Sequence, residues 1–292
     1  MPSSPHISFT HLPRPLISSL LLLVAASVAH AEVKPPPATG GALPLHLRTR
    51  VETFKGSGTW DEVVVVKSFD PRQTALVICD VWDKHWCRGA TERCDALAKR
   101  MAPLVEAARA AGIRIVHAPS DTMDFYKDTP MRKRAVGAPA VKPPEPRKLS
   151  DPPLPIDDSD GGCDTPGDRM HRAWSRQHAA IRVADDDLVS DSGEQIYSYL
   201  QQQGVKNVLI MGVHTNMCVL GRSFGIRQMT RWGMNCVLLR DLTDTMYDPQ
   251  DAPRVSHDRG TELVVEHIEK YWCPSITSDD LAKLSPSSGK SP

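Results

Sequence analysis

The amino-acid sequence predicts a three-layer α/β/α domain built on a doubly wound, mainly parallel sheet. Two observations carry this prediction: short, near-continuous apolar runs, and longer segments between them whose apolar residues recur at helical spacing. Strands that are apolar on both sides are typical of parallel sheets covered by helices on both faces, and the intervening helices supply the crossover connections. At 292 residues, the chain is long enough to bury a large core.

The expected elements follow in order along the chain. Strands are expected where apolar runs are bounded by charged or turn-forming residues, and helices where apolar residues recur every three or four positions and a serine start or a glycine stop lies nearby. The strands are 74–80, 113–119, 205–212 and 235–241, and the helices are 92–112, 190–204, 217–233 and 260–272.

The two ends of the chain differ in character from the domain between them. Residues 1–31 combine Arg14, an uncharged apolar stretch and a closing Ala-His-Ala, which is typical of a secretory signal peptide. An uncleaved N-terminal anchor is the alternative. Residues 32–60 are expected to form an extended arm, 61–280 the domain, and 281–292 a flexible tail. We therefore expect an exported protein, periplasmic or secreted, with no stable membrane span after signal cleavage.

One long segment, 137–168, interrupts the alternation of strands and helices. It is dominated by Pro, Asp and Gly, and a structureless insertion of such length is usually functional or disordered. It follows the second expected strand, so it should leave from the rim of the ligand crevice. We expect a lid or a wall of the pocket, with a disordered surface loop as the alternative.

Charge and cysteine content narrow the function classes. Lysine plus arginine equals aspartate plus glutamate, 35 each, and no basic tract stands out, so no nucleic-acid partner is expected. Seven cysteines is an odd number, so at least one must stay free or pair between chains. Cys87, Cys94 and Cys163 lie in polar surroundings where a bridge could form. Cys79 and Cys236 lie in apolar runs and are expected in the core.

Candidate catalytic residues gather where the parallel strands end, because ligands of such sheets bind at the carboxyl ends of the strands. Three positions mark those ends: Asp80, the segment 117–121 and the turn 214–218. Near a helix start, Cys218 would be favoured as a thiolate nucleophile, and a partly buried Asp80 would have a raised pKa suited to a base. The alternatives are a structural cysteine and a carboxylate that caps a turn.

The sequence resembles the isochorismatase-like cysteine hydrolases, which include nicotinamidases, ureido-compound amidohydrolases and isochorismatase itself. The resemblance rests on "LVICDVWDKHW" (76–86) and on 204–244, where "GVHTNMCV" (212–219) is its most specific piece, and it extends over about 70–280. It implies a parallel sheet flanked by helices and an Asp–Lys–Cys triad, in which Asp80 matches the base and Cys218 the nucleophile.

The resemblance also implies the shape of the turn before the nucleophile. The bond Val213–His214 is expected to be cis, so that backbone N–H groups of the turn face the substrate oxygen. Family members commonly form dimers or tetramers, so a homo-oligomer is expected. The residues expected to bind substrate or its oxyanion are Val213, His214, Thr215, Met217, Trp82 and Tyr247.

The chain departs from the family at the lysine. The corresponding stretch, 179–193, contains no lysine and has Asp185 or Asp186 near the expected place. We expect Lys84 or His85 to supply the cation, since both follow the strand that ends in Asp80. Arg182 and His178 are further candidates, and a solvated loop without a catalytic role is the alternative for 84–85.

A bound metal is not favoured. Metal-dependent members of the family carry an Asp-x-His after the second strand, and here Asp121 could match the Asp while Met123 stands in place of the His. His117 and Asp121 are weak candidates, and His85 and His214 have no clean ligand spacing. No cofactor is expected.

The sequence thus predicts an exported cysteine hydrolase that cleaves a C–N bond of a small amide through a thioester on Cys218. One rival is isochorismatase-like hydrolysis of a vinyl ether. The other is a non-catalytic binding protein on the same fold, which the missing lysine would favour.

Overall fold

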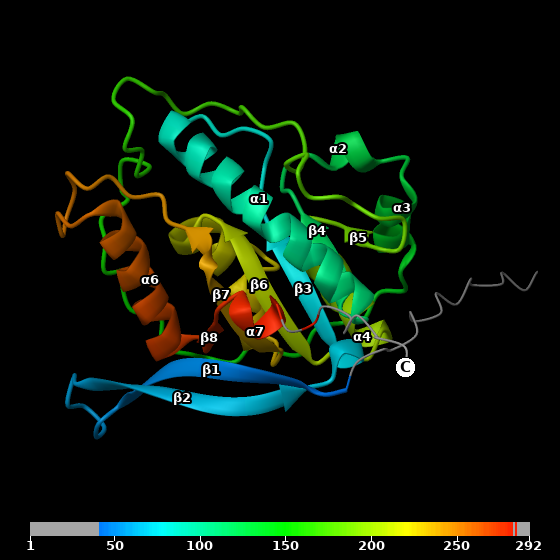
Figure 1. The fold of residues 1–292 in the computed structure, drawn as a ribbon, viewed down its shortest axis with the longest axis horizontal. Coiled ribbons are helices and arrows are strands. Elements are labelled where there is room, and N and C mark those ends of the chain that lie inside the picture. Colours follow the sequence, from blue (N-terminus) through cyan, green and yellow to red (C-terminus); the bar gives the residue numbers. More distant parts are fainter. Residues whose placement is uncertain (1–40, 283, 285–292) are drawn as a thin grey trace, which may run out of the picture. The chain divides into compact units, whose positions relative to one another are not determined.

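An eight-stranded sheet in the order β2-β1-β8-β7-β6-β3-β4-β5 forms the centre of the computed structural model, which describes residues 41–282 and 284 (Figure 1). The strands from β8 to β5 are all parallel, and β1 is antiparallel to both its neighbours. The sheet is therefore mainly parallel, as expected. The strands are β1 (Leu43–Glu52), β2 (Trp60–Phe69), β3 (Thr74–Cys79), β4 (Arg114–Ala118), β5 (Leu188–Val189), β6 (Asn207–Val213), β7 (Asn235–Asp244) and β8 (Ser275–Ile276).

Helices cover both faces of the sheet, which makes three layers (Figure 1). Successive residues of β3 show the division: Ile78 packs in the core on the side of α1 and α7, and Val77 in the core on the side of α4, α5 and α6. All six residues of β3 are buried for this reason. The helices are α1 (Arg88–Ala110), α2 (Met123–Tyr126), α3 (Pro130–Gly137), α4 (Gly193–Gln202), α5 (Ile226–Arg231), α6 (His257–Tyr271) and α7 (Asp279–Ala282).

The expected extended arm at 32–60 is wrong for 43–52, which is strand β1. Leu43 and Leu45 are buried, whereas Arg48 and Arg50 on the other face bind Glu269 of α6 at 2.8 and 3.3 Å. This alternation is the pattern of a half-buried strand. The arm was predicted instead because residues 32–60 are rich in Pro, Gly and Thr, which are typical of linkers. The predicted signal peptide, 1–31, and nearly all of the predicted tail lie outside the described residues.

The insertion 137–168 has no regular structure beyond the end of α3, yet it is fastened to the domain along its length. Backbone N–H groups of Val141 and Arg147 donate to Ser198 Oγ and to the Arg231 carbonyl, at 2.9 and 3.0 Å. Further along, Asp158 accepts a hydrogen bond of 2.7 Å from Asn216, inside the turn that carries Cys218. The segment thus adjoins this turn.

No described helix is both long and apolar enough to cross a membrane.

Candidate functional site

Asp80 follows β3 directly and is fully buried, with a left-handed backbone (φ 48°) that turns its carboxylate back toward the strand ends. One carboxylate oxygen accepts the Ser120 N–H at 2.7 Å. The other accepts Arg222 Nε at 3.0 Å, and the Cys218 thiol is a further hydrogen-bond partner. Asp80 therefore joins the ends of β3 and β4 to the segment after β6.

Cys218 lies in a single wide helical turn, Thr215–Val219, immediately after β6. The bond Val213–His214 is cis, as the resemblance implied. The Thr215 and Thr243 hydroxyls are hydrogen-bonded to each other at 2.7 Å. The Asn216 side chain donates to the Met246 carbonyl and accepts the Met246 N–H, both at 3.0 Å. These contacts fix the turn against the end of β7.

A glycine is required just before this turn. At Gly212, φ is +127°, and an added Cβ would lie 1.9 Å from the Cys79 carbonyl oxygen. Gly212 of β6 is paired with Cys79 of β3 in the sheet, and no room is left for a side chain between the two backbones. The contact brings the residue after β3, Asp80, alongside the turn after β6.

The cation beside Asp80 is Arg222, which was not among the residues predicted from the sequence. Its backbone N–H donates to the Cys218 carbonyl at 3.0 Å, so it lies one helical turn after the cysteine. Its Nη2 also lies 3.5 Å from Asp121 Oδ2. The sequence does contain one indication of this role. Arg222 follows Cys218 by four residues, and side chains at that spacing are neighbours on a helix.

Burial and charge set the protonation of this cluster. Burial raises the pKa of Asp80, and the Arg222 charge opposes that effect. Burial, followed by the Asp80 charge, raises the pKa of Cys218 well above that of an ordinary thiol. For Arg222, burial is the largest single influence and lowers the pKa, but the combined effects of Asp80, Cys218 and Asp121 exceed it, so the net pKa is raised.

The resting cysteine is therefore a thiol hydrogen-bonded to the Asp80 carboxylate. The expectation that the helix start would favour a free thiolate is wrong. The helical turn is only five residues long, and burial, followed by the Asp80 charge, favours the neutral thiol.

The residues predicted to replace the family's lysine make no ion pair with Asp80 in the described part of the chain. Lys84 is exposed, and it makes no ion pair within the described part of the chain. His85 is buried, and burial together with nearby Arg93 lowers its pKa to about 4, so it is neutral at pH 7. Arg182 pairs with Glu106 at 2.6 Å and His178 with Asp95 at 3.2 Å, both on α1.

Aromatic rings follow Asp80 and form a stacked group. Trp82 stacks on Trp174 with ring centroids 4.3 Å apart, and His85 stacks on Trp174 at 5.8 Å. Trp82 also donates its indole N–H to the Ser120 carbonyl at 3.1 Å, beside the residue that holds Asp80. His214 meets His85 edge-on at 4.9 Å, and burial lowers its pKa to about 3. The group is thus uncharged at neutral pH.

Three of the predicted binding residues are engaged elsewhere. Tyr247 is fully buried, and its hydroxyl donates to the Asp251 carbonyl and accepts the Val255 N–H, at 3.0 and 3.2 Å. It is a core residue, and its prediction as a crevice residue is wrong. The Met217 N–H donates to the His214 carbonyl at 3.1 Å, and the Thr215 hydroxyl is paired as described. By contrast, the His214 N–H points to the Cys218 sulfur.

The weak metal candidates do not form a ligand set. His117 is fully buried, with both ring nitrogens within hydrogen-bond distance of other side chains: Gln177 at 2.8 Å and Asp187 at 2.9 Å. Asp121 lies beside Arg222 instead. Among the described residues, the one cluster of three potential ligands is Cys87, Cys163 and Asp168.

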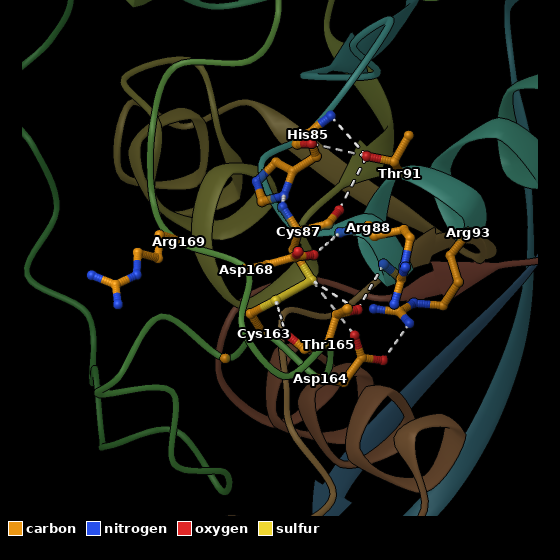
Figure 2. The surroundings of a disulfide bond; sticks show 12 residues. His85, Cys87, Arg88, Thr91, Arg93, Cys163, Asp164, Thr165, Asp168 and Arg169 are labelled. Atoms are coloured by element: carbon orange, nitrogen blue, oxygen red, sulfur yellow. Dashed lines mark hydrogen bonds and ion pairs between the residues drawn. A yellow bond between two sulfur atoms is a disulfide. The ribbon is translucent and has the colours of Figure 1, made fainter.

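Cys87 and Cys163 are joined in a disulfide that ties the insertion to the start of α1 (Figure 2). Around it, Asp168 accepts the Arg88 N–H at 2.7 Å, and Thr165 Oγ1 accepts the Gly89 N–H at 3.0 Å. Of the three cysteines for which a bridge was considered possible, Cys87 and Cys163 thus pair with each other. Cys94, Cys79 and Cys236 are buried and free, and the last two are core residues as predicted.

No family model and no curated protein matches this chain. Solved structures with a similar fold include a cysteine hydrolase from Pseudomonas syringae pv. phaseolicola, at 17% identity over 74% of this chain and 93% of that one, with a TM-score of 0.46. An isochorismatase-like hydrolase from Alkaliphilus metalliredigens is 15% identical over 73% and 96%, with a TM-score of 0.44. An isochorismatase family protein from Burkholderia thailandensis is 21% identical over 73% and 96%, with a TM-score of 0.42. These are proteins of the kind that the motif at 212–219 resembles.

Proposed function

We propose that this chain is a cysteine hydrolase that cleaves the C–N bond of a small amide. The observation that carries the proposal is the constellation of buried Asp80 with half-buried Cys218 and Arg222. A thiol hydrogen-bonded to a carboxylate, with a cation holding that carboxylate ionised, is the arrangement that an acyl transfer to sulfur needs.

The reaction begins when the Cys218 thiol gives its proton to Asp80 and its sulfur attacks the amide carbonyl. The tetrahedral oxyanion forms beside the turn, where the His214 N–H already points to the sulfur. Protonated Asp80 then gives its proton to the leaving nitrogen, the C–N bond breaks, and ammonia or an amine departs from a thioester. Asp80 next takes a proton from water, whose oxygen attacks the thioester carbonyl. The C–S bond then breaks, the acid departs, and Asp80 returns the proton to the Cys218 sulfur.

Arg222 is the positioning residue of this proposal. Its charge keeps Asp80 ionised at the start of each half-reaction, because burial alone would favour the neutral carboxyl. The guanidinium also fixes the direction of the carboxylate, since Nε and the Ser120 N–H hold its two oxygens separately. The carboxylate is thereby held against the thiol.

The surrounding rings favour an uncharged, planar amide as the substrate. His85 and His214 are neutral at pH 7 because their pKa values are lowered to about 4 and 3. Together with stacked Trp82 they place flat rings without a full charge next to the turn that carries Cys218.

Export is part of the proposal. The disulfide between Cys87 and Cys163 supports it, because such bonds persist in oxidising compartments. The signal-like sequence at 1–31 points the same way.

The test is a panel of small primary amides assayed for released ammonia, with mass spectrometry of the chain trapped during turnover. We expect ammonia from at least one planar amide and an acyl adduct on the peptide that contains Cys218. Cys218→Ala should abolish both signals. Cys236→Ala, which removes a buried free thiol elsewhere, should abolish neither. Ammonia release that survives Cys218→Ala would overturn the proposal, and so would turnover of a vinyl ether without any acyl adduct.

A further inference from the structure

Strand β2 lies at one edge of the sheet (Figure 1). The middle of its sequence is apolar and exposed. It reads WDEVVVVKSF, and the four consecutive valines, 63–66, are 37, 53, 52 and 59% exposed. Successive residues of a strand point to opposite faces. Within the part of the chain that the structure describes, both faces in the middle of β2 are therefore apolar and exposed, and no further strand lies along its outer edge.

This edge lacks the usual protection against pairing with another chain. Natural edge strands are commonly shortened, bent by bulges or interrupted by Pro and inward-pointing charges. Here β2 pairs with β1 over ten consecutive residues without a register shift, and it contains no proline. Its charged residues lie near the two ends: Asp61 and Glu62 before the valines, and Lys67 after them.

We propose that β2 is a dimerisation strand, which pairs antiparallel with β2 of a second copy of this chain about a two-fold axis at Val64. Charge complementarity favours a second copy as the partner. An antiparallel two-fold pairing brings the start of one strand beside the end of the other, so the acidic start of β2 meets its basic end. The proposal does not depend on the proposed function.

Strand geometry selects the register. Residues directly opposite in an antiparallel pair must both direct their N–H and C=O groups toward the partner, or both away, so the axis passes through a residue rather than between two. With the axis at Val64, Asp61 lies opposite the second copy's Lys67, and Val63 opposite its Val65. With the axis at Val65, Asp61 would face Phe69 and Lys67 would face Val63, which leaves both charges unpaired.

The pairing joins the two sheets edge to edge and covers the valines from the side. On one face it contributes two Asp61–Lys67 pairs and two Val63–Val65 pairs, and on the other Val64 meets its own copy. Such cross-strand pairs are the unit of sheet stabilisation.

The first experiment measures the mass of the full chain by sedimentation over a concentration series. We expect a dimer, weakened roughly tenfold by Asp61→Lys and similarly by Lys67→Asp, since each change places like charges opposite each other twice. An equimolar mixture of the two variants should regain the original affinity, because each strand then meets its complement. Circular dichroism controls for folding of each variant.

The second experiment reads the register directly. Under mild oxidation, Val64→Cys should give a crosslinked dimer through residue 64 of each copy, because opposite Cβ atoms lie about 4.5–5.5 Å apart, close to disulfide reach. Val66→Cys, on the same face, should not crosslink to itself, since it lies opposite Glu62. A monomer at all concentrations would overturn the proposal. A dimer that is indifferent to both charge changes would also overturn it, as would a mixture that fails to recover or equal crosslinking at 66.

Discussion

Replacing Arg222 with Met should destabilise the folded chain by about 2–3 kcal/mol at neutral pH. At the 3.0 Å between Arg222 Nε and Asp80 Oδ2, the Coulomb attraction is roughly 5 kcal/mol for an effective dielectric constant near 20. Two effects reduce this figure. The Arg222 side chain is 33% exposed, so solvent screens it, and the orphaned Asp80 can relieve its own charge by binding a proton.

The second effect gives the loss a pH dependence with a definite sign. Asp80 has a pKa raised by burial, and Arg222 is the largest influence that lowers it. A carboxyl with a raised pKa binds more protons in the folded than in the unfolded state, so stability is full below its ordinary pKa and falls as pH rises through the raised value. Without Arg222 this window extends to higher pH. The variant should therefore lose more stability at about pH 7.5 than at about pH 5.

The assay is urea unfolding followed by tryptophan fluorescence at both pH values, with Arg227→Met as the matched control. Arg227 makes a similar ion pair of 2.7 Å with Asp151, but that carboxylate is 33% exposed. We expect the control to lose about 1 kcal/mol, including its contact with the Trp272 ring. Equal losses for the two variants, unchanged between the two pH values, would refute the assignment of Arg222 as the partner of a buried charge.

Three further predictions concern the same framework. Asp80→Asn removes the negative charge that raises the Cys218 pKa, so the midpoint of Cys218 alkylation against pH should fall while amide turnover drops by about 10²–10⁴; an unmoved midpoint would contradict the contact. Cys87→Ala opens a disulfide that spans 76 residues, so urea unfolding should show a loss of up to about 4 kcal/mol, and dithiothreitol should no longer affect this variant. Gly212→Ala forces a Cβ against the Cys79 carbonyl and should cost about 3 kcal/mol or more, whereas Gly221→Ala, with open space around its Cβ, should be neutral within about 0.5 kcal/mol; similar melting temperatures would count against the close contact.

Fully buried strands were the elements that the sequence predicted best. The runs at 74–80 and 205–212 match β3 and β6 to within two residues, because a strand buried on both faces leaves a continuous apolar signal. The hairpin of β1 and β2 was missed for the opposite reason. Its second strand carries four valines that are 37–59% exposed, on both faces of the strand, so burial did not give its sequence an alternating pattern.

The predicted helix 217–233 shows a second limit. The structure divides it into the turn around Cys218 and the short α5, which begins after Gly225. Helical periodicity continues across this break, because both pieces bury residues in the same core, among them Val219 and Met229. Spacing alone therefore could not show where the turn around the cysteine ends.

Asp80 and Cys218 were predictable as residues that follow buried parallel strands, because topology alone brings such ends together. The cation was not, since Lys84 and His85 were chosen for their distance along the chain from Asp80. The residue that pairs with Asp80 instead follows the nucleophile by one helical turn. A charged residue one helical turn after a candidate nucleophile can be recognised in a single sequence.

The position of Arg222 on the same segment as Cys218 determines which contacts keep the three residues aligned. Because Arg222 and Cys218 share one segment after β6, nucleophile and cation move as a unit, and only Asp80 comes from a different strand. Their alignment therefore depends on how closely β3 and β6 approach, which is set where Gly212 lies against Cys79. A change that widens this contact would separate Asp80 from the thiol and from the guanidinium together. Such a change should abolish the proposed hydrolysis before it unfolds the chain.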